Sequence, residues 1–572
     1  MSSSAPDHWE DLLRWLKEKH PGFETSLELR DVPGAERCLV ATASAKPGET
    51  LLHIPASAML NPLTLIRDSP IPKHLFPQPT HRISTTNSSK RVKTSPSTAT
   101  STATTAQSSV SSSKPLDTTQ LLTLHIALTR DPLKRYPSEW DVYMNALPRE
   151  FRPWHPLTWL ITPQKSTKND KSKIEEDEKE WEWWSKLAEK GLSPTTRIKL
   201  DDVKKRFEHD EEVIMEVLRK EKPFKSHNLA TTLTSEDLLW AWLNVNTRSI
   251  SLPLGLPGST ERMNHTLVPI LDFINHSSKP ALITPRVEQL PAPSPLRNGI
   301  ATSNGNTNGN VGSSSNGQSS SSSTSGSAST TSIPSTTRRP STLSASQNGH
   351  HLIPGKIDLR LLPPEKEGIQ AGQEILFEYG GHSSGTLFAE YGFCEMPAEE
   401  EGEEGWLGLK YGEMDLGWLV DELCDKQGKE GKEEKEKVLE KIGCWGLNTI
   451  HAQPSPPHPS HALLMTLRVL HLDSNSPKIP NIENGFTTYI SPANELAAIS
   501  SLEKTLRRVV KESDKRLGWL ERLDCSSADE ESEKETERQK EGVVRMLKGM
   551  CVEEKVLAEK VLEKIEAGED FS

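Results

Sequence analysis

Cysteine is scarce in this chain, with six residues among 572, and they are scattered along the sequence. None of them forms a Cys-x-x-Cys pair, so the sequence indicates neither a disulfide framework nor a structural zinc site. Isolated cysteines without such pairing are typical of a reducing compartment. The pattern therefore predicts a protein of the cytoplasm, the nucleus or both, with no bound metal.

Long apolar runs are also missing. No stretch approaches the ~20 apolar residues that a membrane span requires. The first residues, MSSSAPDHWEDLLRWL, have neither a basic start nor an unbroken apolar segment, so we do not expect them to act as a secretory signal. Asn275-His276-Ser277 has the spacing of an N-glycan acceptor. Without secretion that interpretation falls away.

An excess of positive charge is absent as well, because the formal net charge is −12. A mildly acidic chain is not expected to bind nucleic acid through bulk charge. It is expected to attract a protein partner with a basic or lysine-bearing segment. The composition thus favours a protein substrate over a nucleic acid or a membrane.

Apolar anchors are few in residues 80–117, which are mostly Ser, Thr and Ala, and in residues 286–350, which are rich in Ser, Asn and Gly. Both segments are predicted to be disordered inserts. The glycines of the second segment do not make a phosphate loop, because no strand precedes them and no helix follows. Lengthening a loop from ~10 to ~65 residues costs only about 1.7 kcal/mol of closure entropy, so a folded core tolerates the insert.

Regular elements are predicted before the first insert. Apolar residues at helical spacing predict a helix over 7–19. Short strands are expected at 37–43 and 51–55, with a Lys-Pro-Gly turn between them.

A second well-marked helix is predicted over 234–250. Thr234 and Asp237 have the spacing of a capping box, and Arg248 lies near the C-terminal end. Beyond residue 396, Lys/Glu spacing predicts further helices. A solvated loop is expected near 525–540.

A polar pair ends an apolar, largely β-branched run. Residues 267–274 are predicted to form a buried strand, and Asn275 and His276 follow directly. Together these two side chains offer donors and acceptors. On the residues alone, the pair is either a turn with a satisfied Asn or a place where a ligand is met.

Three stretches taken together resemble the SET-domain protein methyltransferases: WAWLNVNTRSI, LVPILDFINHS and GQEILFEYGGHSSGTLFAEYGF. They are most similar to the subgroup of Rubisco large-subunit methyltransferase. Within it they resemble the branch of SET domain-containing protein four and the fungal ribosomal lysine methyltransferases. The resemblance covers residues 31–395, apart from the two inserts.

The resemblance implies an α+β fold, in which small β-sheets surround a knot-like core with an inserted helical region and a C-terminal all-α domain follows. Residues 1–30 are then an N-terminal helix, 31–395 the SET domain, and 396–572 a helical domain like the substrate-binding domain of the subgroup.

The resemblance also assigns roles. Asn275 and His276 would contact S-adenosyl-L-methionine, and Arg248 would meet its carboxylate, a task that suits a guanidinium fork. Tyr379 would lie beside both the cofactor and the methyl-transfer channel. Tyr391 would be the second channel tyrosine, which helps to place the lysine amine.

Two positions depart from the family pattern. Glu36-Arg37-Cys38 stands where the family has Gly-x-Gly, which predicts an altered edge of the cofactor pocket. Ser384-Gly385 replaces the family's Ser-Asn, so one polar contact is expected to be missing.

Three further residues near the motifs are predicted to have no role in the chemistry. Asp272 is expected to brace the strand end, His382 to be a loop residue outside the site, and Cys394 to be inert because no metal partner accompanies it.

The resulting hypothesis is a monomeric S-adenosylmethionine-dependent protein-lysine N-methyltransferase that acts on a non-histone protein such as a ribosomal protein. Two alternatives stay open, namely a protein-histidine methyltransferase and a catalytically silent SET-like peptide-binding module. Tyr391 favours lysine, because the histidine-directed relatives lack a tyrosine there.

Overall fold

The computed structural model describes residues 5–30, 37–77, 114–130, 136–161, 171–256, 261–279, 283–289, 356–473, 476–523, 531–569 and 571. Most of the two predicted inserts, 80–117 and 286–350, lies outside the described residues, as does Glu36. Residues 286–289 are described and belong to a strand, so the second insert begins later than predicted.

Short antiparallel strands make the first part of the fold. The largest sheet has the order β1-β4-β9-β8. Its strands are β1 Glu24–Thr25, β4 Leu52–Ile54, β9 Ile357–Leu362 and β8 Thr284–Gln289. Two further pairs join β2 (Leu27–Arg30) to β3 (Cys38–Ala41) and β5 (Ser249–Ser251) to β6 (His265–Leu267). The strands predicted at 37–43 and 51–55 are thus confirmed as β3 and β4.

The remaining pair in this part of the chain is parallel. Strand β7 (Asn275–His276) lies beside β10 (Leu376–Phe377), with Asn275 opposite Leu376. A parallel pair requires a long connection, and here the second insert lies within it. The two halves of the fold on either side of the insert therefore meet at the Asn-His pair.

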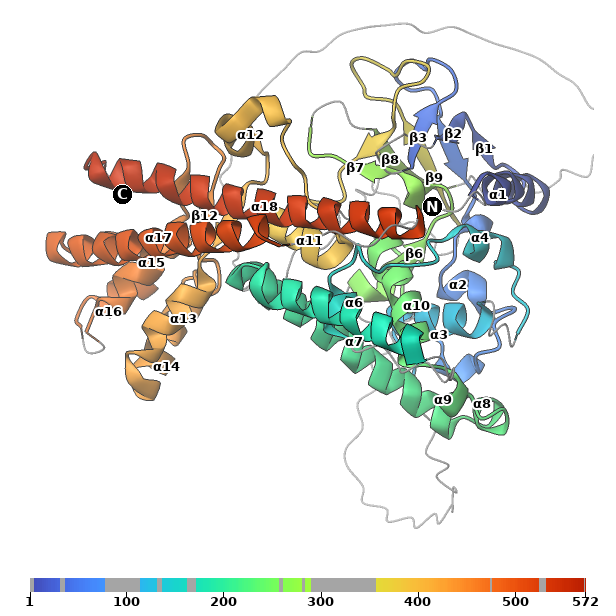
Figure 1. Cartoon of the computed structure of the whole chain (residues 1–572), viewed down its shortest axis with the longest axis horizontal. Helices are drawn as coiled ribbons and strands as arrows, with labels where there is room; N and C mark the ends of the chain where they lie inside the picture. The colour runs from blue at the N-terminus through green and yellow to red at the C-terminus, as the bar shows by residue number, and fades with distance from the viewer. Residues whose placement is uncertain are drawn as a thin grey trace, which may run out of the picture.

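Helices cover one side of these sheets (Figure 1). Helix α1 (Ala5–Lys19) confirms the helix predicted over 7–19. Helix α3 (Thr118–Thr129) is buried along its whole length and packs against α10 (Ser235–Arg248). The other helices of this part are α2 Pro62–Leu65, α4 Asp141–Ala146, α5 Leu157–Leu160, α6 Lys171–Lys190, α7 Pro194–Lys220, α8 Lys222–Ser226 and α9 Leu229–Thr232.

Helix α10 begins where its capping box predicts. The Thr234 side chain accepts a hydrogen bond from the Asp237 backbone N–H, and the Asp237 carboxylate accepts one from the Thr234 N–H at 3.0 Å. This satisfies donors that the first helical turn leaves open. The cap sets the register of the helix and hence the position of Arg248 at its other end.

The C-terminal region is mainly helical, as predicted. Helix α11 (Ser384–Tyr391) comes before this region, whose helices are α12 Gly402–Gly408, α13 Gly417–Asp425, α14 Gly428–Lys441, α15 His461–Leu470, α16 Ile479–Glu483, α17 Pro492–Glu521 and α18 Glu531–Glu566. The region also contains a small antiparallel sheet that the sequence analysis did not foresee, formed by β11 Glu413–Asp415, β12 Thr449–His451 and β13 His458–Pro459. The loop predicted near 525–540 is wrong for residues 531–540, which belong to α18.

Helix α18 joins two hydrophobic cores. Leu547 and Met550 pack into the core that contains the SET-like sheets. Leu557 and Val561, further along the helix, pack into a second core with α13, α15 and α17. In Figure 1 the paired helices α17 and α18 run from the first core out to the left edge of the molecule.

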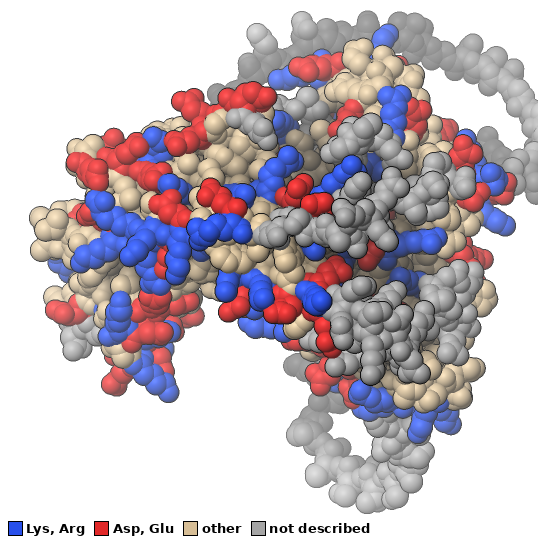
Figure 2. Space-filling model, in the orientation of Figure 1, with Lys and Arg blue, Asp and Glu red and all other residues tan. Residues whose placement is uncertain are grey.

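Charges of both signs share the surface of this helical pair (Figure 2). Arg508 pairs with Glu422 and Glu512, and Lys555 pairs with Asp514. The net negative charge is therefore not a uniform field over the molecule. In the described part of the chain, no helix combines the length and apolar character needed to cross a membrane.

A buried carboxyl group lies where α18 meets the start of α11. The Glu553 side chain is 3% exposed, and its Oε1 atom has no hydrogen-bond partner among the described residues. Burial raises the pKa of Glu553 to about 7, although the Ser384 hydroxyl lowers it. At alkaline pH this junction therefore holds a poorly solvated charge.

We expect Glu553→Gln to stabilise the protein at pH 8 by up to about 3 kcal/mol. The pKa of Glu553 in the folded state exceeds the reference value of 4.5. Stability from this group is therefore complete below pH 4.5 and is lost as pH rises through about 7. Glutamine mimics the protonated form. Urea unfolding should therefore give the wild-type protein and Glu553→Gln equal unfolding free energies near pH 4.5, and the variant a larger one at pH 8. A gap that is the same at both pH values would contradict the assignment.

Candidate active site

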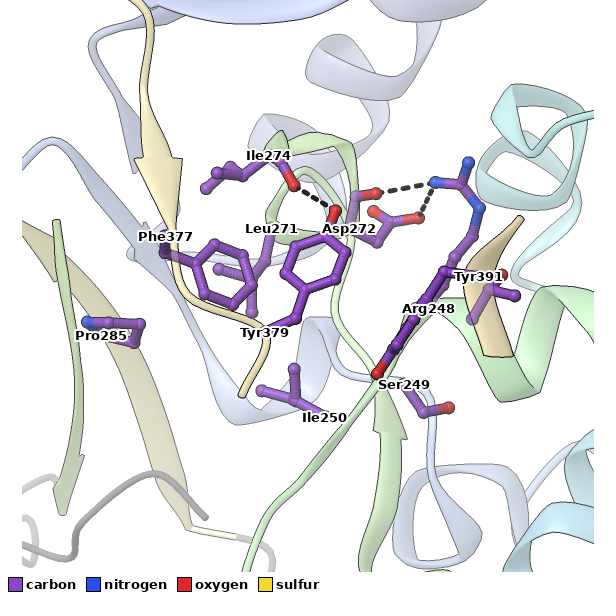
Figure 3. Close-up of a pocket in the computed structure, with 11 residues that line it drawn as sticks. Arg248, Ser249, Ile250, Leu271, Asp272, Ile274, Pro285, Phe377, Tyr379 and Tyr391 are labelled. Carbon is purple, nitrogen blue, oxygen red and sulfur yellow. Dashed lines mark hydrogen bonds and ion pairs between the residues drawn. The ribbon is translucent and has the colours of Figure 1, made fainter. Parts of the chain in front are cut away.

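One pocket in the described part of the chain gathers side chains from elements that are distant in sequence. It encloses about 520 Å³ of empty space, including the part open to solvent. Its walls come from the end of α10, β5, the turn η4 (Leu271–Phe273), β10 and the end of α11 (Figure 3). The lining residues are Thr247, Arg248, Ser249, Ile250, Leu271, Asp272, Ile274, Pro285, Phe377, Tyr379 and Tyr391.

Arg248 ends α10 and turns toward η4. Its Nη1 atom donates to the backbone oxygen of Asp272 at 2.7 Å and to Asp272 Oδ2 at 3.3 Å, as the dashed lines in Figure 3 mark. The Nε atom is buried without a hydrogen-bond partner among the described residues. The Nη1 atom of Arg248 is thus engaged by Asp272, whereas its Nε atom remains a hydrogen-bond donor without a partner among the described residues.

Asp272 is the anionic counterpart of Arg248 inside the fold, with a side chain that is 0% exposed. Its Oδ2 atom also accepts a hydrogen bond from the Tyr143 hydroxyl at 3.0 Å. Burial raises the pKa of Asp272 to about 6, and Arg248 and Tyr143 oppose that rise. These contacts agree with the predicted bracing role, and they add that the brace acts on Arg248.

The strand predicted over 267–274 is wrong, because the segment is broken into three parts. Strand β6 ends at Leu267, η4 follows, and β7 begins at Asn275. Pro269 has no N–H to donate to a ladder, which ends the strand. Ile270 then adopts φ +71° and ψ −45°, a backbone conformation that is rare for a β-branched residue and turns the chain. This turn carries Asp272 to Arg248.

Asn275 is held by protein groups on both sides. Its Nδ2 atom donates to the backbone oxygen of Arg37 at 3.2 Å and to Glu374 Oε1 at 3.0 Å. The simple alternative of a satisfied Asn therefore accounts for its amide nitrogen, although in a strand and not in a turn. The contact also brings Asn275 to the stretch where the family's Gly-x-Gly is absent.

His276 lies behind the pocket wall, with its side chain fully buried. Its Nδ1 atom accepts a hydrogen bond from the backbone N–H of Tyr379 at 3.0 Å. The imidazole proton is thereby assigned to Nε2, which lies 3.8 Å from Glu395 Oε1. Burial lowers the pKa of His276, so the ring is neutral near pH 7. The Asn-His pair thus positions the strand that leads to Tyr379.

Tyr379 occupies the centre of an aromatic cluster. Its hydroxyl donates to the Ile274 backbone oxygen at 2.7 Å. Its ring centroid lies 5.3 Å from that of Tyr391, 5.1 Å from Phe377 and 5.2 Å from His276. The two tyrosines, which come from different elements, therefore share one wall of the pocket.

Tyr391 is fixed by the end of α11. Gly392, at φ +85°, closes the helix, and a Cβ there would lie 2.7 Å from the Trp154 backbone oxygen, so glycine is required. The neighbouring Glu390 pairs with Arg206 at 2.5 Å and accepts from Asn246 at 3.2 Å. This buried pairing ties the end of α11 to α7 and α10.

The predicted site residues therefore fall into two groups. Arg248, Tyr379 and Tyr391 line the pocket, whereas Asn275 and His276 are not among the lining residues and support its wall from β7. Sequence reasoning missed Phe377, which lines the pocket. The signal was present, since the two-residue spacing of Phe377 and Tyr379 places both on one face of an extended segment.

The other residues singled out from the sequence have simple explanations. At position 385 a Cβ would lie 3.0 Å from Thr196 Oγ1, so the family's Asn would crowd α7. Burial raises the pKa of the Cys394 thiol well above its usual range, which fits an inert residue. Among the described residues, no three His, Cys, Asp or Glu side chains form a group able to hold a metal ion.

Comparison with known proteins supports the architecture. No family model matches the chain, and no curated protein matches it by sequence. Among solved structures, "Crystal structure of the SET domain of LSMT bound to Lysine and AdoHcy" is similar with a TM-score of 0.51 and 14% identity, covering 99% of this chain and 92% of that one. "Structure of Rubisco LSMT bound to Sinefungin and Monomethyllysine" gives 0.49 and 14%, with the same coverage. The first likeness confirms the predicted α+β SET fold with a helical C-terminal region.

Proposed function

We propose that this SET-fold protein is an S-adenosylmethionine-dependent protein-lysine N-methyltransferase with a non-histone protein substrate. The observation that carries the proposal is the meeting of three segments at one pocket. Arg248 ends α10, the Asn275–His276 strand pairs with β10, and Tyr379 and Tyr391 share a wall. The solved structure with the higher similarity is described as bound to lysine and AdoHcy, which agrees in kind with this proposal.

The polar atoms left open around the pocket suit a cofactor with an amino-acid end. Arg248 Nε, Ser249 Oγ and Asp272 Oδ1 are buried without hydrogen-bond partners among the described residues. Unsatisfied buried groups are costly, so a ligand that pairs with them gains affinity. Arg248 would hold a carboxylate, with Asn275 and His276 supporting the cofactor side. The cofactor would supply a methyl group from its sulfonium.

The aromatic wall suits an uncharged amine. Free lysine has a pKa near 10.4, so removing its proton at pH 7 costs about 4–5 kcal/mol. Burial of the amine between Phe377, Tyr379 and Tyr391 disfavours its charged form and lowers that cost. Rigid tyrosine rings then hold the nitrogen in line for transfer. No separate strong base is required.

Lysine is favoured over histidine as acceptor because Tyr391 lies at the second channel position. The finer assignment, to the branch of SET domain-containing protein four and the fungal ribosomal lysine methyltransferases, belongs to this proposal and rests on the Tyr379 to Phe393 motif. A reducing compartment, cytoplasm or nucleus, fits five buried free cysteines among the described residues.

A silent peptide-binding module is the second candidate. It is favoured by the engagement of Arg248 Nη1 with Asp272 and of Asn275 Nδ2 with Arg37 and Glu374. If these contacts persist in the presence of the cofactor, its amino-acid end loses two donors. Calorimetry with S-adenosylmethionine and with a lysine-bearing peptide measures the binding of each, and the labelling experiment below separates the candidates, since only the enzyme transfers the methyl group.

The deciding experiment is incubation of the protein and methyl-labelled S-adenosylmethionine with an extract of cells that lack the protein. We expect a labelled protein band that disappears with Asn275→Ala, because that change removes the contacts holding the β7 strand. Mass spectrometry of the band then identifies lysine or histidine as acceptor. Cofactor binding without any labelled band would reject the enzyme in favour of the silent module.

A further inference from the structure

A four-residue loop and helix α11 together connect the two channel tyrosines. Residues 380–383 lead from Tyr379 directly into α11, which ends at Tyr391. The loop is tight, since the backbone N–H of His382 donates to the Gly380 oxygen at 3.0 Å. Any side chain that contacts both ends of this connection therefore influences how far apart the tyrosines lie.

The His382 ring packs on the Gly380 backbone. A Cβ built at position 380 would lie 2.5 Å from His382 Nε2 and 3.0 Å from Cδ2. Gly380 also has φ +155°, which other residues rarely adopt. Glycine at 380 is thus required for two reasons, and one of them is to make room for the imidazole next to Tyr379.

The same ring packs on the second tyrosine. The centroids of His382 and Tyr391 are 6.3 Å apart, with an interplanar angle of 45°. His382 is only 6% exposed, so it is enclosed between these neighbours and not turned to solvent. It lies between the backbone that follows Tyr379 and the ring of Tyr391.

The imidazole acts as a neutral packing group. Burial lowers the pKa of His382 to about 4, although Glu390 and Glu378 oppose the shift. Its Nε2 atom has no hydrogen-bond partner among the described residues. Because the ring is neutral at pH 7, it adds no positive charge beside the channel, and it acts through van der Waals packing.

The C-terminal region blocks the loop from the other side. A Cβ at Gly381 would lie 2.9 Å from Cε1 of Tyr411, so the Tyr411 ring rests on the loop. The Tyr411 hydroxyl donates to Glu378, which also pairs with Lys410 at 2.6 Å. The loop cannot relax outward without breaking these contacts, so a change in the size of residue 382 is transmitted to the tyrosines.

We infer that His382 is a positioning residue that sets the separation of Tyr379 and Tyr391, and with it the width of the channel offered to the acceptor amine. The inference rests on the proposed methyl transfer for its functional consequence. His382 does not line the pocket, so the inference adds a positioning role to a loop residue that the sequence analysis expected to lie outside the site. Its effect is expected at the transfer step, because the ring contacts the backbone after Tyr379 and the ring of Tyr391, the two residues that would place the acceptor amine.

The test combines kinetics with tyrosine NMR. His382→Ala should lower kcat by about tenfold to a hundredfold, because small misplacements of reacting groups have effects of that size. The KM for S-adenosylmethionine should stay within about threefold, as expected for a loss confined to transfer. In protein labelled with ¹³Cζ-tyrosine, which gives six signals, the Tyr391 signal should shift. His382→Phe, which keeps a flat ring, should recover part of kcat.

His125→Ala is the matched control. His125 is also buried, and burial lowers its pKa to about 4 as well, but it lies in α3 and does not line the pocket. Its loss should leave the Tyr391 signal in place. An unmoved Tyr391 signal in both His382 variants, or a moved signal with unchanged kcat, overturns the inference. A wild-type protein without transfer refutes the proposed function instead, while the NMR signal still decides the ring placement.

Discussion

Tyr379→Phe is expected to lower kcat for methyl transfer by about a hundredfold, the usual scale for loss of one well-placed polar group at a reacting centre. The hydroxyl donates to the Ile274 oxygen, and this bond holds the ring against the wall it shares with Tyr391. Without the bond the ring keeps its apolar contacts but loses its fixed position, so alignment suffers more than binding. Initial rates with labelled cofactor measure the change.

The folded state should be little affected by the same substitution. Loss of one hydrogen bond costs about 1 kcal/mol of unfolding free energy, which urea unfolding resolves. Tyr489→Phe is the matched control, because Tyr489 is 47% exposed in the C-terminal region and has no part in the pocket. Equal rates for both variants would show that Tyr379 is a core aromatic residue and not a channel residue.

Arg248→Met is expected to destabilise the protein by about 3–5 kcal/mol, because removing one member of a buried ion pair strands the other. Asp272 would keep the Tyr143 hydroxyl and its own backbone N–H as partners for its fully buried carboxylate, with no cation beside it from Arg248. Its pKa, already raised to about 6, would rise further. Cofactor binding should weaken in parallel, since the Nε donor at the pocket is lost.

The loss of stability in Arg248→Met is expected to depend on pH. A carboxyl group with a raised pKa contributes most to stability when protonated, and the contribution falls as pH rises through the folded-state pKa. The deficit of Arg248→Met should therefore grow from pH 5 to pH 8. The double variant with Asp272→Asn should recover part of it, since no unpaired charge then remains. Additive losses in the double variant would mean that the two residues do not act as a pair.

Elements whose signals are local could be predicted from the amino-acid sequence. The capping box at Thr234 predicted where α10 begins, because the donors of a first helical turn must be satisfied by nearby side chains. Apolar spacing located α1, and short apolar runs on either side of a Lys-Pro-Gly turn located β3 and β4. The family motifs pointed to the SET fold and to the two tyrosines. These features depend on residues a few positions apart, so a single amino-acid sequence is enough to predict them.

The contacts and burial of the side chains around the pocket could be found only from the folded structure. Tyr379 binds His276 across 103 residues, and Arg248 is paired with Asp272 before any ligand is considered. Nothing in the local sequence of His382 indicates its burial between Gly380 and Tyr391. The small C-terminal sheet and the break at Ile270 were likewise unforeseen. The physical reason is that partners, burial and pKa depend on segments brought together by folding, and no periodicity along the chain encodes which segments those are.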